Sequence, residues 1–156
     1  MDPGGIKRYI ISALANLEGR GFEVPGMVDA VIDDTGALAF SVTGTCPEVS
    51  VGPVAEVRLD EVWQPIGVQL WERSEYAYDL VDRPMNRRRA WHMHAVRQSR
   101  AALGSPAHEH CEEVLGRPAC DHYLGIELRD IHEGIALIDG AWMEPGPLGC
   151  GALMCA

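Results

Sequence analysis

EYAYDLVDRPMNRRRAWHMHAV, residues 75–96, places two segments with the two-residue periodicity of β-strands on either side of a turn signal. The turn signal, DRPMN, contains Pro84 and Asn86, whose backbone preferences favour reversal of the chain. Strands joined by so short a turn pair as antiparallel neighbours. The stretch therefore predicts a β-hairpin, and with it an antiparallel sheet at the centre of the fold.

The segments before this hairpin continue the same pattern toward the N-terminus. MVDAVI (27–32) and ALAFSVT (37–43) flank DDTG, which is a second hairpin signal. VAEVRL (54–59) and GVQLWE (67–72) have the composition of two further strands. Together with the 75–96 hairpin, these segments predict a sheet built from consecutive hairpins.

Apolar residues at helical spacing predict one helix near each end of the chain. The first helix has an apolar face made of Ile6, Ile10, Ala13, Leu14 and Leu17. In the second, Ile131, Ile135 and Ile138 share a face that Gly134 interrupts. Between the sheet and this helix, SPAHEHCEEVLG predicts a loop followed by a short helix, and RPACDHYLG predicts a loop or short strand. The predicted class is α+β, an antiparallel sheet of hairpins or a meander with an N-terminal and a C-terminal helix.

The length of 156 residues favours a single domain with a substantial core. We expect an N-terminal helix in 1–22, mainly β-structure in 24–97, His/Cys-rich loops and the closing helix in 98–140, and an irregular tail in 141–156. No apolar run approaches the ~20 residues that span a bilayer, and the N-terminus lacks the pattern of a secretory signal. The expected location is the cytoplasm, with no membrane partner.

The distribution of charge singles out one segment. The chain has 13 lysines and arginines against 23 acidic residues. Residues 83–100 nevertheless contain six arginines and no acidic residue. Such a basic segment in an acidic chain indicates a site for an anionic partner.

The basic segment also carries His92 and His94, which share a strand face with Arg88 because alternate residues point the same way. Trp91 and Met93 point to the other face, which we expect to be the core side. Arg87 and Arg89 point to that same face by the same alternation. Tyr76 and Tyr78 likewise share one face of the preceding strand. The sequence predicts that these tyrosines converge with the histidines and arginines on one face.

Histidine and arginine together suit acid–base chemistry on an RNA phosphodiester. An imidazole with a pKa of about 6.5 exchanges protons near neutrality, and the arginine fork matches the phosphate group. One histidine would deprotonate the ribose 2′-hydroxyl and another group would protonate the leaving oxygen, without a metal ion. The candidate proton-transfer residues are His92, His94, His108 and His110. The candidate RNA-binding residues are Tyr76, Tyr78, Arg87, Arg88 and Arg89.

Cysteine and histidine between residues 108 and 122 suit a different chemistry, a structural zinc site. Five cysteines, an odd number, argue against a disulfide framework and leave thiols or metal ligands. A tetrahedral set would combine Cys111, Cys120 and His122 with either His108 or His110. The spacing matches no zinc-finger pattern, since the chain has no Cys-x2-Cys.

The order of these motifs resembles the TumE family, small toxins of bacterial toxin–antitoxin pairs that are thought to act as ribonucleases. The resemblance covers roughly residues 54–138 and rests on SEYAYDLVD, RRRAWHMH, SPAHEHCE and LRDIHEGIALI. It implies RNA as substrate and an antitoxin as protein partner. It points to Tyr76, Tyr78, Arg89, His92, His94, His108 and His110. The N-terminal helix and hairpin, the cysteine-bearing segment 111–122 and the acidity depart from the family pattern.

The sequence thus favours a TumE-like, metal-independent endoribonuclease that requires no cofactor for catalysis. Two alternatives from other classes remain open. One is a non-catalytic interaction module with a structural zinc ion. The other is an acidic inhibitor or nucleic-acid mimic, which the surplus of acidic residues outside the basic segment suggests.

Overall fold

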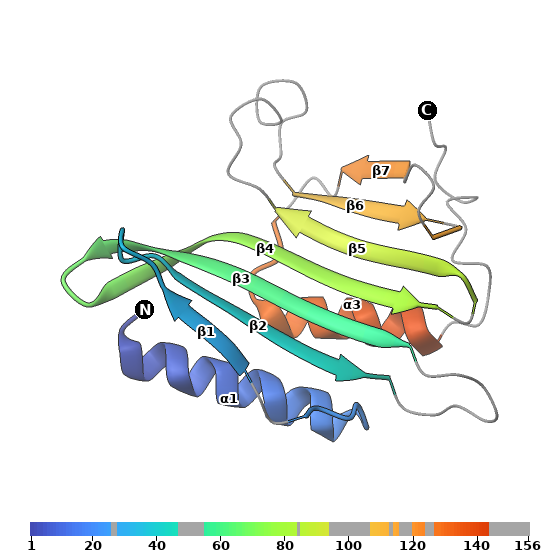
Figure 1. Cartoon of the computed structure of the whole chain (residues 1–156), viewed down its shortest axis with the longest axis horizontal. Coiled ribbons are helices and arrows are strands. Elements are labelled where there is room, and N and C mark those ends of the chain that lie inside the picture. The colour runs from blue at the N-terminus through green and yellow to red at the C-terminus, as the bar shows by residue number, and fades with distance from the viewer. Residues whose placement is uncertain are drawn as a thin grey trace.

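The computed structural model describes residues 1–25, 28–46, 55–83, 85–93, 107–112, 114–115, 120–123 and 127–143, with the backbone alone for 120–123. The elements are α1 (Pro3–Gly19), β1 (Val28–Ile32), β2 (Leu38–Thr45), β3 (Glu56–Gly67), β4 (Leu70–Asp82), β5 (Arg87–Met93), β6 (Ala107–Glu112), β7 (Cys120–Tyr123) and α3 (Ile131–Met143). The described strands form one seven-stranded sheet in the order β1 to β7, with every pair antiparallel (Figure 1). The predicted α+β class, with an N-terminal and a C-terminal helix, is confirmed.

Three predicted elements differ from the structure. GVQLWE is not a separate strand: it contains the β3–β4 turn, with Gln69 at φ 54°, and the start of β4. AHEHCE forms β6 where we expected a loop and a short helix, because its alternation of buried and half-buried residues satisfies a sheet rather than a helix face. The closing helix continues to Met143, past the predicted start of the irregular tail. The rest of that tail lies outside the described residues.

Both helices cover the same face of the sheet. Asp2 caps the N-terminus of α1 by accepting a hydrogen bond from the Gly5 amide, and Pro3 occupies the first turn. In α3, Ile131, Ile135 and Ile138 are fully buried, which confirms the predicted apolar face. In Figure 1, α1 runs along β1 and α3 lies behind β3 and β4. We call the other side of the sheet, which neither described helix covers, the open face.

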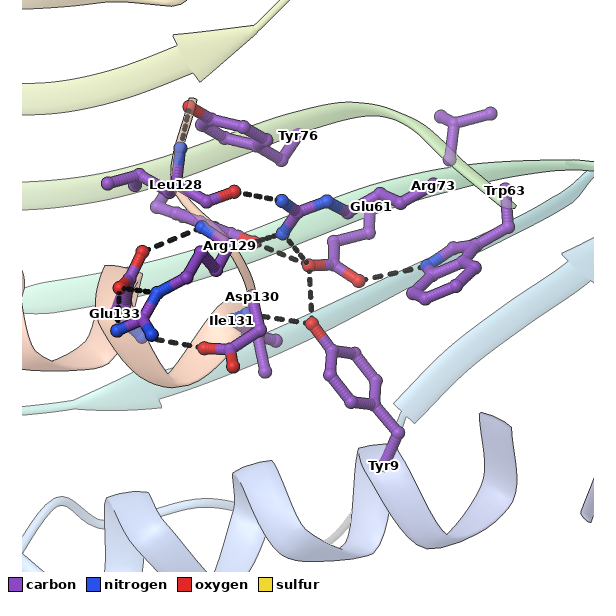
Figure 2. A network of polar contacts seen from close by, with 12 residues as sticks. Tyr9, Glu61, Trp63, Arg73, Tyr76, Leu128, Arg129, Asp130, Ile131 and Glu133 are labelled. Carbon is purple, nitrogen blue, oxygen red and sulfur yellow. Dashed lines mark hydrogen bonds and ion pairs between the residues drawn. The ribbon is translucent and has the colours of Figure 1, made fainter. Parts of the chain in front are cut away.

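A buried polar network joins α1 and the start of α3 to the sheet (Figure 2). Its centre is the Glu61 carboxylate on β3, whose side chain has no exposed surface. Glu61 accepts hydrogen bonds from the Tyr9 hydroxyl of α1 at 2.9 Å, from the Trp63 indole at 2.9 Å and from Arg73 of β4 at 3.0 Å, and also from the Tyr78 hydroxyl. Burial, followed by the charge of Glu61, raises the pKa of both tyrosines, so both remain donors. Sequence periodicity did not indicate this network.

The network also fixes the segment that leads into α3. Arg73 donates to the Leu128 carbonyl, and the Leu128 amide donates to the Tyr76 hydroxyl at 3.2 Å. At the start of α3, the Ile131 amide donates to the Tyr9 hydroxyl at 2.7 Å. A buried carboxylate is stable in the interior when several donors and a cation face it, and Glu61 has three donors on Oε1 and the Trp63 indole on Oε2. The network therefore sets where α3 begins on the sheet.

Gly134, which interrupts the apolar face of α3, is required by the packing of the helix on β4. A Cβ atom at this position would lie 2.2 Å from Cδ2 of Tyr78. We expect Gly134→Ala to lower the free energy of unfolding by about 1–3 kcal/mol because the ring or the helix must move. Gly140→Ala is the matched control on the same helix, since a Cβ atom there meets nothing within 4 Å and alanine favours a helix by up to about 1 kcal/mol. Urea unfolding of both variants measures the difference, and equal stabilities would contradict the proposed contact.

Candidate functional site

The register between β4 and β5 decides which side chains share a face. Ala77 pairs with His92, and Tyr78 pairs with Trp91. Directly opposed residues of an antiparallel pair point to the same side. Trp91 and Met93 are buried against the helices, 2% and 5% exposed, so the predicted core side of β5 is confirmed.

The predicted convergence of tyrosines and histidines is wrong. Tyr76 and Tyr78 lie on the helix-covered side with Trp91, because the turn places them in register with that face of β5. Both rings are buried, stack on each other with centroids 4.8 Å apart, and use their hydroxyls in the network around Glu61. An RNA-binding role for these two residues stays a prediction. In this placement, neither tyrosine ring is accessible to a base of RNA.

Three of the four predicted histidines meet on the open face of β5 and β6. The ladder pairs His92 with His108 and places His110 opposite Ala90. The ring centroids are 5.8 Å apart for His92 and His108, 4.8 Å for His92 and His110, and 4.6 Å for His108 and His110. One ligand nitrogen of each ring lies within 4.8 Å of the others. We call these three residues the histidine cluster; His94 lies outside the described residues.

Charged groups border the histidine cluster on both sides. Asp79 of β4 has Oδ2 3.6 Å from Nε2 of His92. Arg88 donates to Asp79 at 2.6 Å and to Glu112 of β6 at 2.7 Å. Burial alone would raise the pKa of Asp79, but the contact with His92 and the charge of Arg88 outweigh it and hold that pKa below its usual value. Asp79 is therefore a carboxylate at neutral pH and orients the His92 ring.

The arginine run is neutralised within the sheet. On the helix-covered side, Arg87 donates to Asp82 at 2.9 Å and Arg89 donates to Glu109 at 2.6 Å, while Arg88 bridges two carboxylates on the open face. The three guanidinium side chains are 13%, 23% and 28% exposed, in the order Arg87, Arg89, Arg88. Their assignment as RNA-binding residues remains a prediction. Of the three, Arg88 is the one beside the histidine cluster.

The predicted zinc ligands separate onto two faces. Cys111 follows His110 on β6, and neighbouring residues of a strand point to opposite sides. The Cys111 thiol is buried and donates to Glu109 at 3.6 Å, on the side of Trp91. A zinc ion therefore cannot be shared between Cys111 and either His108 or His110, and that part of the prediction is wrong. The ladder pairs Cys111 with Cys120 and Glu109 with His122, so the other predicted ligands occupy neighbouring register positions, while the side chains of Cys120 and His122 lie outside the description.

A cavity on the sheet adjoins the charged groups of this site. Its volume is about 820 Å³. Its lining includes Asp79, which contacts the histidine cluster, and Thr43, Arg58 and Arg83 from β2, β3 and the β4–β5 turn. The two arginines are more than 60% exposed. The cavity thus places two exposed guanidinium groups near Asp79, although Arg58 is paired with Asp60 and Arg83 with Glu56, which also lines the cavity.

Sequence reasoning missed Asp79 and Glu112 as neighbours of the histidines. Asp79 follows Tyr78 on β4 and therefore points to the opposite face. Once the register with β5 is known, this places Asp79 on the same face as the histidines. Glu112 is two residues after His110 and shares its side of β6 by the same alternation. Strand periodicity showed which residues of one strand share a face. It did not show the register between strands, which brings these carboxylates to the histidines.

Comparison with protein-family models, with curated proteins and with solved structures finds no match to this chain. Among the helices of the described residues, none has the length and apolar character needed to cross a bilayer. The functional interpretation therefore rests on the geometry of the open face.

Proposed function

We propose that the protein cleaves RNA and that the histidine cluster is its reactive centre. The observation that carries the proposal is the meeting of three imidazoles with the guanidinium of Arg88 on one partly exposed patch of β5 and β6. Imidazoles supply a base and an acid near neutral pH, and a guanidinium stabilises the charge of a phosphorane.

The chemistry follows from the substrate's own nucleophile. One imidazole takes the proton of the ribose 2′-hydroxyl, whose oxygen attacks phosphorus. A second imidazole protonates the 5′-oxygen that leaves, so a cyclic phosphate and a free hydroxyl are formed. His92 is the favoured base because Asp79 lies against its Nε2 and stabilises the imidazolium that proton uptake creates. His108 or His110 is then the acid, since one nitrogen of each lies within 4.8 Å of the others and two of them reach one phosphodiester.

Substrate approach and cellular location complete the proposal. The cavity beside Asp79, with the exposed Arg58 and Arg83, is the favoured path for the RNA backbone.

The acidity of the chain, with a formal net charge of −10, favours a basic partner protein, which the TumE resemblance would identify as an antitoxin. A cytoplasmic location fits this substrate and the buried Cys46 thiol, because thiols persist in reducing compartments.

The experiment compares two oligonucleotides that differ at one atom. Chelator-treated protein is incubated with a single-stranded RNA and with the same strand carrying a 2′-deoxy sugar at the cleaved position. We expect cleavage of the first and none of the second at that position, because the 2′-oxygen is the nucleophile. His110→Ala should lose about 10²–10⁴-fold in rate. His132→Ala is the matched control, since His132 contacts Ser12 and Asn16 of α1 away from the histidine cluster.

Two results would contradict the proposal. Cleavage of the 2′-deoxy strand at the same position would exclude the 2′-oxygen as nucleophile. Equal loss of rate in the His110→Ala and His132→Ala variants would indicate a general loss of structure rather than loss of a reacting group.

A second candidate is the interaction module with a structural zinc ion. The observation that favours it is the pairing of Cys111 with Cys120 across β6 and β7, with His122 two residues further along. A zinc ion there would link the last strand of the sheet to its neighbour. The cobalt titration described in the next section distinguishes this site from the histidine cluster, because only a cysteine site gives thiolate–cobalt charge transfer.

A further inference from the structure

We propose that His92, His108 and His110 together bind one divalent transition-metal ion, zinc by preference, and that the bound ion switches the RNA-cleaving site off. The binding site itself is independent of the proposed function, whereas the switch rests on it. The histidine cluster differs from the cysteine-containing set that the sequence predicted, because it lies on the opposite face of β6.

The geometry of the donor nitrogens is close to that of a zinc site. Zinc binds imidazole nitrogen at about 2.0–2.1 Å, so the nitrogens of a tetrahedral site lie about 3.4 Å apart. The three nitrogens of the histidine cluster already lie within 4.8 Å of one another. Rotations of the side chains that move each nitrogen by about 1 Å close this difference. The paired backbones of β5 and β6 hold the three residues in adjacent positions, so little backbone order remains to be gained on binding.

The charged groups around the histidine cluster also suit a metal ion. Asp79 and Glu112 face the cluster from β4 and β6, and Arg88 from β5 balances one of the two carboxylates. With neutral imidazoles, Asp79, Glu112 and Arg88 sum to one excess negative charge, which a bound divalent cation compensates. Oδ2 of Asp79 also lies 3.6 Å from Nε2 of His92, and a carboxylate beside a histidine is the arrangement that supports metal ligands.

The number and type of ligands indicate which metal ions the cluster would bind. Three imidazoles from the protein leave a fourth position of a tetrahedral ion for water. Imidazole nitrogen suits zinc, copper, nickel and cobalt, and a site without thiolate or several carboxylates disfavours calcium and magnesium. The ligand class is therefore a borderline divalent transition metal.

The switch follows because a metal ion and a proton use the same lone pair. An imidazole that binds zinc cannot accept the proton of a 2′-hydroxyl, and it has no proton to give to the leaving oxygen. If His92, His108 and His110 all bind one ion, each proton-transfer group proposed within the described residues is occupied. Metal binding and direct cleavage of RNA are then mutually exclusive.

The test of the site is a cobalt titration of the metal-free, full-length protein, followed by visible absorption. We expect one equivalent of cobalt to bind with the strong d–d absorption of a tetrahedral ion and without a thiolate charge-transfer band. His92→Ala, His108→Ala and His110→Ala should each lose this absorption, and Asp79→Asn should weaken binding by about 10–100-fold. His132→Ala and Cys111→Ala are the controls and should bind cobalt as the wild type does.

The test of the switch is RNA cleavage with and without one equivalent of zinc. We expect cleavage in chelator, its loss when zinc is added, and its return when chelator is restored. Failure of the folded wild-type protein to bind cobalt, or a thiolate band that disappears in Cys111→Ala, would overturn the site. Cleavage that zinc leaves unchanged or increases would overturn the switch. Cobalt binding by the three histidines without cleavage of RNA in chelator would overturn the proposed function while supporting the site.

Discussion

The His92→Ala variant is expected to cleave RNA about 10²–10⁴-fold more slowly than the wild type while unfolding at nearly the same urea concentration. The imidazole lies on the open face, where Asp79 keeps Arg88 as a partner after the substitution. The change in the free energy of unfolding should therefore stay within about 1 kcal/mol. The substitution should lower the cleavage rate rather than the stability, because it removes the proposed general base.

Trp91→Ala, one residue earlier on β5, is expected to have the opposite effect: a loss of stability without a loss of cleavage rate. The indole is 2% exposed, and its ring receives the Arg89 guanidinium at 5.4 Å from the ring centroid. Its removal should lower the free energy of unfolding by about 3–5 kcal/mol because a large cavity remains in the core. The folded fraction of this variant should retain the cleavage rate of the wild type.

Urea unfolding followed by circular dichroism, together with cleavage rates per folded molecule, measures both variants. A His92→Ala protein that unfolds early but cleaves normally would show that the histidine is structural. A stable but inactive Trp91→Ala protein would place the reacting groups on the aromatic face.

Glu61→Gln is expected to lower the free energy of unfolding by about 3–5 kcal/mol, the usual cost of removing one partner of a buried ion pair. Arg73 would retain a buried charge without its carboxylate, and its side chain is only 11% exposed. The amide also presents donor hydrogens to a site where four neighbouring groups already donate: Tyr9, Trp63, Arg73 and Tyr78. The substitution keeps the shape of the side chain, so the loss reports charge and hydrogen bonding.

Glu56→Gln provides the control on the same strand. Glu56 pairs with Arg83 at the surface, where both side chains are more than half exposed, and such pairs contribute about 0–1 kcal/mol. Urea unfolding of the two variants compares the same chemical change in a buried and an exposed setting. Equal losses of stability would show that the network around Glu61 contributes no more than a surface ion pair.

By itself, the sequence determined the α+β class, the helices near the two ends of the chain and which face of β5 is buried. Periodicity is local, so Ile131, Ile135 and Ile138 could be assigned to one helix face, and Trp91 and Met93 to the core, without knowledge of their neighbours. For SPAHEHCEEVLG the sequence predicted a loop followed by a short helix, so it did not predict that His108 and His110 share one side of a strand. The prediction of a loop there was wrong because β6 is stabilised by its pairing with β5 and β7, which its own sequence does not reveal.

The tertiary structure alone decided which faces of different strands coincide. A shift of one residue in the β4–β5 register would move every side chain of one strand to the other face, and the turn type and loop length that set this register were not predicted from the sequence. The actual register brings Asp79 to His92 and buries Tyr78 against Glu61. Sequence could count the arginines, but only the fold pairs each of Arg87, Arg88 and Arg89 with a carboxylate, because those partners lie up to 24 residues away along the chain. Electrostatic contacts depend on distance in space, which local sequence patterns do not encode.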